Sequence, residues 1–248
     1  MTGARILIGI DDTDDLESRG TGFHARELGR LIEQAGLGTC SGVSRHQLLF
    51  DRRIPYTSHN SSLCLDLTAD PASGAALHMH CRAYLLASSA RDADVGLCIV
   101  AWQDVDHAVE EFGRRAKREI LTQDEATGLS RDRNILLEGL TGDRGGVIGA
   151  LAAAGLRRTD RDGRFVWRRG VRELSGVVTA GELLASTGID EIRSLSGTAV
   201  GSGDAINVEP WPRPVLIDGR AVLLVEEVEE TDAPYRWRNA PKSVVKQY

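Results

Sequence analysis

The sequence predicts an α+β fold, and three observations support this class. A continuous apolar run at residues 6–10 has the length and composition of a buried strand. Strand-like and helix-like patterns then alternate twice over residues 63–120, which is typical of a small ferredoxin-like α+β layer. Apolar residues make up 42% of the 248 residues, so a chain of this length can bury a core without disulfide bonds.

The first half of the chain shows the clearest alternation of elements. Leu28, Leu31 and Ile32 recur at helical spacing, and Gly36 is a suitable C-terminal stop for that helix. Residues 63–67 alternate leucine with polar side chains, as a half-buried strand does. We expect strands at 6–10, 47–50, 63–67 and 95–102, a loop at 71–73, and helices at 22–36, 74–88 and 104–120, the last with Asp104 as its N-cap.

The second half has weaker patterns. A glycine-rich turn at 141–146 precedes the apolar run 147–154. Thr179 and Glu182 form a capping box that begins a short helix ending near residue 186. We expect strands at 135–140, 163–169 and 221–228, and a mobile polar tail at 231–248.

Composition excludes several classes of protein. The formal net charge of −6 is unlike that of a dedicated nucleic-acid-binding protein. The four cysteines form no CxxC pair, which excludes a cysteine-based zinc ribbon and indicates reduced, buried thiols. None of the lysines follows a GxxxxG stretch, so an ordinary P-loop is excluded. With no signal peptide and no apolar run of membrane-spanning length, we expect a cytoplasmic protein without membrane contact.

Four carboxylates follow the first predicted strand within five residues. Asp11, Asp12, Asp14 and Asp15 repel one another, which raises their pKa values unless a cation neutralises them. Mg²⁺ prefers carboxylate oxygens and bridges to substrate phosphates. The sequence therefore favours a metal or phosphate site at the end of this strand, and the alternative is a solvated acidic turn that helps to cap the next helix.

A second candidate is the glycine-rich turn with Arg144, Gly145, Gly146 and Gly149. Such a turn before a helix lets backbone N–H groups and the helix dipole meet a phosphate, and the arginine can add a charge-assisted bond. The alternative is close packing of the following helix through its small residues. The turn lacks a GxGxxG pattern, so it does not predict a dinucleotide site.

Polar loops supply further candidates. Residues 54–62 carry hydroxyl, amide and imidazole groups suited to binding a ligand, although polar loops are common. Asp204 lies in a flexible Gly-Ser-Gly-Asp turn and is a candidate ligand contact. His78 and His80 would point to different faces of a helix, so we do not expect a metal site there. Residues 157–172 contain seven arginines and two aromatic residues, which indicates either contact with a phosphate backbone or the solvated face of a strand.

Four motifs in order resemble those of archaeal agmatidine synthetases, which attach agmatine to the wobble cytidine of an isoleucine tRNA. They are GIDDTD at 9–14, IPY at 54–56, RGGVIGALAAAG at 144–155 and PRPVLIDGR at 212–220. The resemblance extends over nearly the whole chain in outline, and the acidic motif and RGGVIGAL are its most specific parts. The resemblance covers only the catalytic half of the family's proteins, because we expect no counterpart in this sequence to the OB-fold and the zinc ribbon with which they hold the tRNA.

The resemblance implies a kinase-like α/β domain at 1–61 and 126–230, interrupted by a ferredoxin-like α+β domain at 62–125 and followed by the tail. It also implies that ATP is cleaved to AMP and two phosphates with the help of Mg²⁺. Matched by position, Asp11, Asp12 and Asp14 would be the catalytic residues and metal ligands. The nucleotide contacts would be Thr13, Arg144, Gly145, Gly146 and Gly149, and the substrate contacts Tyr56, Thr57, Ser58, His59, Asn60 and Asp204.

Two departures from the family pattern define the alternatives. Phe23 stands where the family has a threonine that becomes phosphorylated, and Thr57 and His59 replace the basic residues that usually follow IPY. We expect an ATP-using ligase or phosphotransferase that activates a small molecule, or a tRNA with the help of added RNA-binding modules, for joining to an amine such as agmatine. The alternative is a non-catalytic nucleotide-binding or regulatory module.

Overall fold

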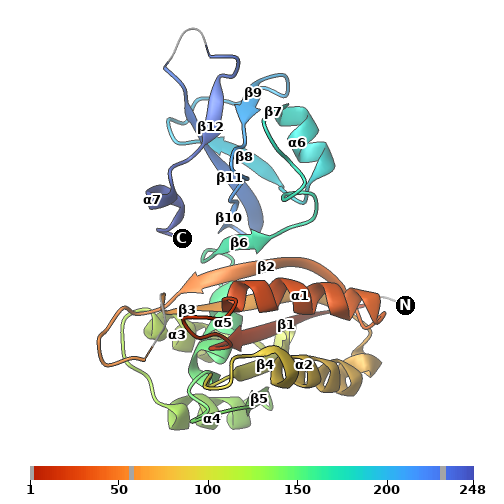
Figure 1. The fold of residues 1–248 in the computed structure, drawn as a ribbon, viewed down its shortest axis with the longest axis vertical. Helices are drawn as coiled ribbons and strands as arrows, with labels where there is room; N and C mark the ends of the chain where they lie inside the picture. The colour runs from red at the N-terminus through yellow and green to blue at the C-terminus, as the bar shows by residue number, and fades with distance from the viewer. Residues whose placement is uncertain (1–2, 56–58, 230–232) are drawn as a thin grey trace. The chain divides into compact units, whose positions relative to one another are not determined.

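The computed structural model describes residues 3–55, 59–229 and 233–248. It divides into two compact units, residues 1–159 and residues 160–248 (Figure 1), and each is described separately. Both units combine helices and strands, so the predicted α+β class is confirmed.

Unit 1 is built on a five-stranded sheet with the strand order β5-β4-β1-β3-β2. All neighbouring strands are antiparallel, and Gly9 of β1 lies opposite Cys64 of β3 and Cys98 of β4. The strands are β1 (Ala4–Asp11), β2 (Thr39–Gln47), β3 (Ser61–Ala69), β4 (Gly96–Ala101) and β5 (Leu136–Gly139). The central strand β1 ends at Asp11, so the acidic motif lies at the C-terminal end of this strand.

Helices cover both faces of this sheet. The helices of unit 1 are α1 (Thr21–Gln34), α2 (Gly74–Ser88), α3 (His107–Ala116), α4 (Gln123–Asp132) and α5 (Val147–Arg158). Alternation along β1 sends Leu7 and Gly9 towards α5, and Ile8 towards the opposite face, where Gly29 of α1 approaches Leu65. A Cβ at Gly9 would lie 1.9 Å from the carbonyl oxygen of Ala150, which shows how closely α5 packs on β1.

Unit 2 contains seven short or medium strands and two helices among the described residues. They are β6 (Arg164–Trp167), β7 (Val177–Thr179), α6 (Ala180–Ser186), β8 (Glu191–Ser194), β9 (Ala205–Asn207), β10 (Val215–Ile217), β11 (Arg220–Glu227), β12 (Trp237–Asn239) and α7 (Lys242–Val245). Strand β11 pairs with β10 and β12 in antiparallel orientation and with β8 in parallel orientation. The core around Leu183, Leu223 and Trp237 is fully or almost fully buried.

Several predicted elements need correction. The strand expected at 47–50 is misplaced, because β2 covers residues 39–47 and ends at Gln47. This strand lies at the edge of the unit 1 sheet, and its serine, arginine and glycine residues do not form the apolar pattern from which a strand is predicted. The helix expected from Asp104 begins at His107, because Asp106 is the residue whose side chain accepts from the N–H groups of Ala108 and Val109. Residues 71–73 form a 3₁₀ turn.

The predicted mobile tail is also wrong for the residues described in it. Residues 237–239 form β12 and residues 242–245 form α7, and the Trp237 side chain is fully buried. A polar segment can join a core through one large apolar residue, which composition alone does not reveal. The expected domain boundaries at 61/62 and 125/126 stay predictions, as do the kinase-like and ferredoxin-like assignments; strands from both sides of residue 61 share the unit 1 sheet.

Candidate active site

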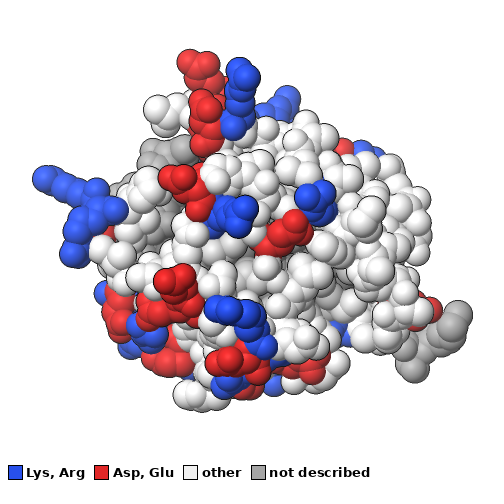
Figure 2. Space-filling model, turned by 90° about the horizontal axis from the view of Figure 1, so that it is seen from below, with Lys and Arg blue, Asp and Glu red and all other residues white. Residues whose placement is uncertain are grey.

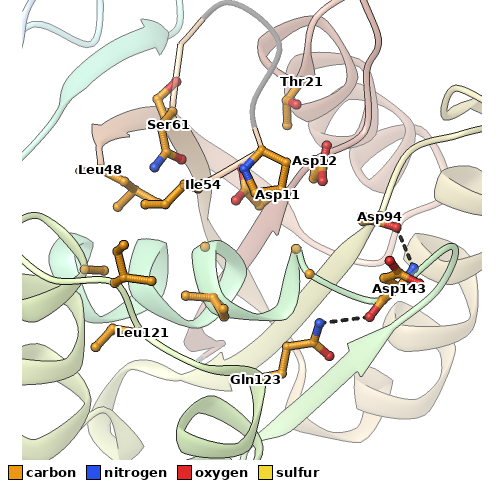
Figure 3. Close-up of a pocket in the computed structure, with 18 of the residues that line it drawn as sticks. Asp11, Asp12, Thr21, Leu48, Ile54, Ser61, Asp94, Leu121, Gln123 and Asp143 are labelled. Atoms are coloured by element: carbon orange, nitrogen blue, oxygen red, sulfur yellow. Dashed lines mark hydrogen bonds between the residues drawn. The ribbon is translucent and has the colours of Figure 1, made fainter. Parts of the chain in front are cut away.

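A pocket of about 370 Å³ opens where β1 ends and α5 begins in unit 1. Asp11 and Asp12 lie between two contrasting sides of it (Figure 3). Asp94 and Asp143 mark one side, and Leu48, Ile54 and Leu121 mark the other. The pocket therefore offers a strongly acidic end and an apolar wall, which suits a ligand with a charged part and an apolar or aromatic part.

The acidic end is created by the sharp turn after β1. Asp12 adopts a left-handed backbone conformation with φ of 53°, which aspartate tolerates better than most residues. Burial and the neighbouring Asp12 carboxylate raise the pKa of Asp11 to about 8. Burial, Asp94 and Asp14 raise the pKa of Asp12 to about 6. Both carboxylates are thus costly to ionise here, although the Arg45 charge partly opposes the shift at Asp11, and a bound cation would stabilise their ionised forms.

Asp94 joins this group from the segment before β4, and sequence reasoning missed it. Its carboxylate accepts a hydrogen bond from the backbone N–H of Asp143, and its backbone carbonyl accepts one from Gly146. The Gln123 side chain donates to the Asp143 carbonyl, as Figure 3 shows. No local motif marks Asp94, which the sheet brings beside the end of β1.

Asp14 is tied to the first turn of α1. Its Oδ1 accepts hydrogen bonds from the Thr21 hydroxyl at 2.6 Å and from the Thr21 backbone N–H at 3.1 Å. Arg45 of β2 lies close by, and burial lowers its pKa while Asp14 and Asp11 oppose that shift. A Cβ at Gly22 would lie 2.6 Å from a terminal nitrogen of Arg45, so the glycine makes room for this guanidinium beside the acidic end.

The glycine-rich turn brings α5 close to the end of β1, and its phosphate contact stays a prediction. Gly145, Gly146 and Gly149 line the pocket. A Cβ at Gly149 would lie 1.8 Å from Oδ2 of Asp11, so only glycine lets the carboxylate approach α5 at this point. A Cβ at Gly146 would meet the Asp94 carbonyl at 2.5 Å. Close packing through small residues is therefore real, and it is also what brings α5 to the carboxylates.

The backbone N–H groups at the start of α5 are already engaged. Those of Gly146, Val147 and Ile148 donate to the carbonyls of Asp94, Arg144 and Gly145. These N–H groups are therefore not available to a phosphate. A phosphate next to Gly145 at this helix end would interact mainly with the helix dipole.

The apolar wall and the neighbouring polar residues complete the lining. Leu48, Ala116, Ile120, Leu121 and Ile148 contribute apolar surface, and none of them was singled out from the sequence. His59 and Asn60 line the pocket as expected. The Asn60 amide donates to the Leu49 carbonyl at 2.6 Å, so it also holds the segment that carries Leu48.

The other predicted site residues either do not belong to the pocket lining or are not described by the structure. Arg144 is exposed, has φ of 64° and does not belong to the pocket lining. Asp204 belongs to unit 2, where it accepts a hydrogen bond from the Trp237 indole at 2.9 Å. Thr13 is fully buried beside the pocket, and its hydroxyl has no hydrogen-bond partner among the described residues. Tyr56, Thr57 and Ser58 lie outside the described residues.

The carboxylates of the acidic end suit a Mg²⁺ ion that is also bound by substrate phosphates and water. Nowhere in the described ranges do three Asp, Glu, His or Cys side chains converge as a ready-made metal cage. Magnesium is normally held by one or two carboxylates together with substrate phosphates and water, and the crowded Asp11 and Asp12 match that donor set. A metal that arrives with a nucleotide fits this pocket better than a metal resident in the protein alone.

None of the described helices has both the length and the apolar character needed to span a bilayer. On the face shown in Figure 2, acidic and basic side chains are interspersed and much of the surface is neither. The uncompensated carboxylates of the pocket contrast with this mixed exterior.

Comparison with known proteins identifies similar folds. No family model matches the chain. An uncharacterised protein of Methanocaldococcus jannaschii is 29% identical over 152 residues, which are 61% of this chain and 50% of that protein. The crystal structure of TiaS in complex with an isoleucine tRNA and ATP is similar with 25% identity and a TM-score of 0.55. A tRNA fluorescent labelling enzyme is similar with 26% identity and a TM-score of 0.54.

Each of these two structural alignments covers 61% of this chain and 36% of the solved chain. Apo TiaS, described as a tRNA agmatidine synthetase, matches with 24% identity and a TM-score of 0.53, which shows the fold alone. The chain thus spans half the length of the curated relative and 35–36% of the solved chains. The resemblance expected over nearly the whole chain is thus shown over 61% of it, and over that part the protein is similar in fold to TiaS.

Proposed function

We propose that this protein is an ATP-using enzyme that activates a substrate by phosphoryl or adenylyl transfer at the pocket of unit 1, for ligation to an amine such as agmatine. The observation that carries the proposal is the group of uncompensated carboxylates, Asp11, Asp12 and Asp94, beside the glycines of α5. The similarity to a protein solved with ATP and an isoleucine tRNA supports ATP as the nucleotide and RNA as the substrate class.

Each part of the pocket has a distinct role in this proposal. Asp11 and Asp12 would hold Mg²⁺, which supplies charge neutralisation for the phosphates when it is bound. Asp14 orients the start of α1 through Thr21. The apolar wall of Leu48, Leu121 and neighbours offers a slot for the flat, weakly polar face of the adenine. Positioning and electrostatic preorganisation would supply most of the rate enhancement.

The proposal is tested by ATP cleavage with Mg²⁺ in the presence of RNA and agmatine, comparing wild type with Asp11→Ala. Removing a ligand of the cation that neutralises the developing charge should lower the cleavage rate by about 100-fold or more. Asp15→Ala is the matched control, because Asp15 belongs to the same cluster of four aspartates but is exposed and does not line the pocket. Equal phosphate release from wild type and Asp11→Ala would contradict the proposal. Nucleotide binding without cleavage under all these conditions would favour the non-catalytic module.

A further inference from the structure

A half-exposed tryptophan in unit 2 lies beside two arginines. Trp211 is 38% exposed, although most large apolar side chains of this unit are buried. The guanidinium carbon of Arg172 is 5.3 Å from its ring centroid, and that of Arg213 is 4.7 Å away. Both distances are within the range of a cation–π contact. The three side chains form one surface cluster, which we call the Trp211 cluster.

The Trp211 cluster is held in place by hydrogen bonds from neighbouring elements. The Asn239 amide of β12 donates to the carbonyls of Val208 at 2.8 Å and of Trp211 at 3.2 Å. The Arg172 guanidinium donates to the Val166 carbonyl of β6 at 3.3 and 3.4 Å. Because these anchors use backbone carbonyls, they position the side chains without neutralising their charge.

Neither arginine of the cluster has a carboxylate partner within the residues the structure describes. Six other arginines of unit 2 differ in this respect: Arg161, Arg168, Arg193, Arg220, Arg236 and Arg238 each lie within 4 Å of an aspartate or glutamate oxygen. Partial burial and the charge of Arg213 lower the pKa of Arg172. Partial burial also lowers the pKa of Arg213. The charge of Glu173 opposes this shift at Arg172, but among the described residues it forms no ion pair with either arginine of the cluster, and two like charges held together favour an anionic ligand.

We propose that the Trp211 cluster binds single-stranded RNA, with Arg172 and Arg213 meeting the phosphates and Trp211 offering a stacking surface to the bases. Single-stranded nucleic acids are recognised by this combination of cations with exposed aromatic rings. Guanidinium planes add further stacking surface for bases. An acidic peptide could use the two charges, but it would leave the exposed indole without a flat partner. This inference deepens the proposed function, on which it rests for RNA as the substrate class.

Binding is measured by the fluorescence anisotropy of a labelled dodecauridylate at several salt concentrations. We expect Arg172→Ala and Arg213→Ala each to weaken binding by about 5- to 10-fold and to reduce the slope of log affinity against log salt by about 0.7 per lost phosphate contact. Trp211→Ala should weaken it by about 5- to 150-fold, the equivalent of about 1–3 kcal/mol of stacking per base, whereas Trp211→Phe should keep most of the affinity because it keeps a stacking ring.

Arg236→Ala is the matched control, because Arg236 also lies over a tryptophan of unit 2 but pairs with Glu227. Its affinity for RNA should equal that of wild type. Cluster variants that bind like Arg236→Ala would overturn the inference, and so would equally tight binding of polyglutamate of the same charge. Mg²⁺-dependent ATP binding is recorded for every variant. A variant that keeps ATP binding but loses RNA binding locates the effect in the Trp211 cluster. A wild-type protein that does not bind ATP argues against the proposed function.

Discussion

The substitution Gly149→Ala should separate nucleotide affinity from the stability of the fold. A Cβ at this position would lie 1.8 Å from Oδ2 and 2.5 Å from Cγ of Asp11, so the carboxylate has to move. The nearest atoms belong to a short side chain that faces a pocket, and not to backbone. The helix α5 can therefore stay in place while the Asp11 carboxylate swings away from the position in which it would hold a metal.

The opposing contributions to stability are of similar size. Replacing a helical glycine with alanine stabilises a helix by about 1 kcal/mol. Overpacking against Asp11 costs about 1–3 kcal/mol. The free energy of unfolding should thus fall by no more than about 2 kcal/mol, which a domain of ordinary stability tolerates. The affinity for Mg²⁺-ATP should fall by about 10-fold or more, the equivalent of about 1.4 kcal/mol, because one carboxylate is lost from the cation site.

Calorimetric titration of Mg²⁺-ATP gives the affinity, and urea unfolding gives the stability. Gly128→Ala is the matched control, because Gly128 lies on α4 and a Cβ there would meet no atom within 4 Å. It should stabilise the protein by about 1 kcal/mol or less and leave nucleotide affinity unchanged. Wild-type affinity in Gly149→Ala would refute the idea that Asp11 acts from its position against α5.

Three further substitutions probe the packing of β1, the titration of Asp11 and the role of Asp204. Gly9→Ala should lower the free energy of unfolding by about 3 kcal/mol or more, because the new Cβ would meet the backbone oxygen of Ala150 at 1.9 Å; an unchanged urea midpoint would contradict this. At pH 8 in EDTA, Asp11→Asn should raise the free energy of unfolding by about 1–3 kcal/mol. This gain is smaller than the full shift in pKa would give, because water in the pocket stabilises the ionised carboxylate of the wild type. Between about pH 4 and 8 the unfolded chain loses the Asp11 proton and the folded one keeps it, so wild-type stability falls with rising pH, and Asp11→Asn should remove this fall in thermal unfolding. Asp204→Ala should cost about 1 kcal/mol through the lost Trp237 hydrogen bond and leave ATP cleavage intact; loss of cleavage would restore Asp204 as a site residue.

The elements of unit 1 with strong periodic patterns could be predicted from the sequence. The run at 6–10 and the leucine alternation at 63–67 correspond to β1 and β3, but β3 is buried on both faces and not half-buried as predicted, because Asp66 pairs with Arg5 and Arg157. Strand β2 was misplaced, since a polar strand at the edge of the unit 1 sheet lacks an apolar run. The short strands of unit 2 depend on pairing with distant segments, and no local pattern encodes such pairing.

The candidate site was predictable where chemistry is concentrated in a short motif. Asp11, Asp12 and Gly149 were found because acidic and glycine-rich clusters are visible locally, and the structure brings them together. Asp94 and the apolar wall were missed, because tertiary contacts alone bring them to the pocket. Arg144 was assigned from its neighbours, and its exposed position outside the pocket lining leaves its nucleotide contact a prediction.

Calorimetric titration of ATP into the wild-type protein, with Mg²⁺ and then with EDTA, tests the central idea most directly. The crowded carboxylates repel a bare triphosphate, so we expect binding that requires Mg²⁺ and that Asp11→Asn weakens while Asp15→Asn does not. ATP binding of equal strength in EDTA, or no binding under either condition, would contradict a nucleotide site built on these carboxylates.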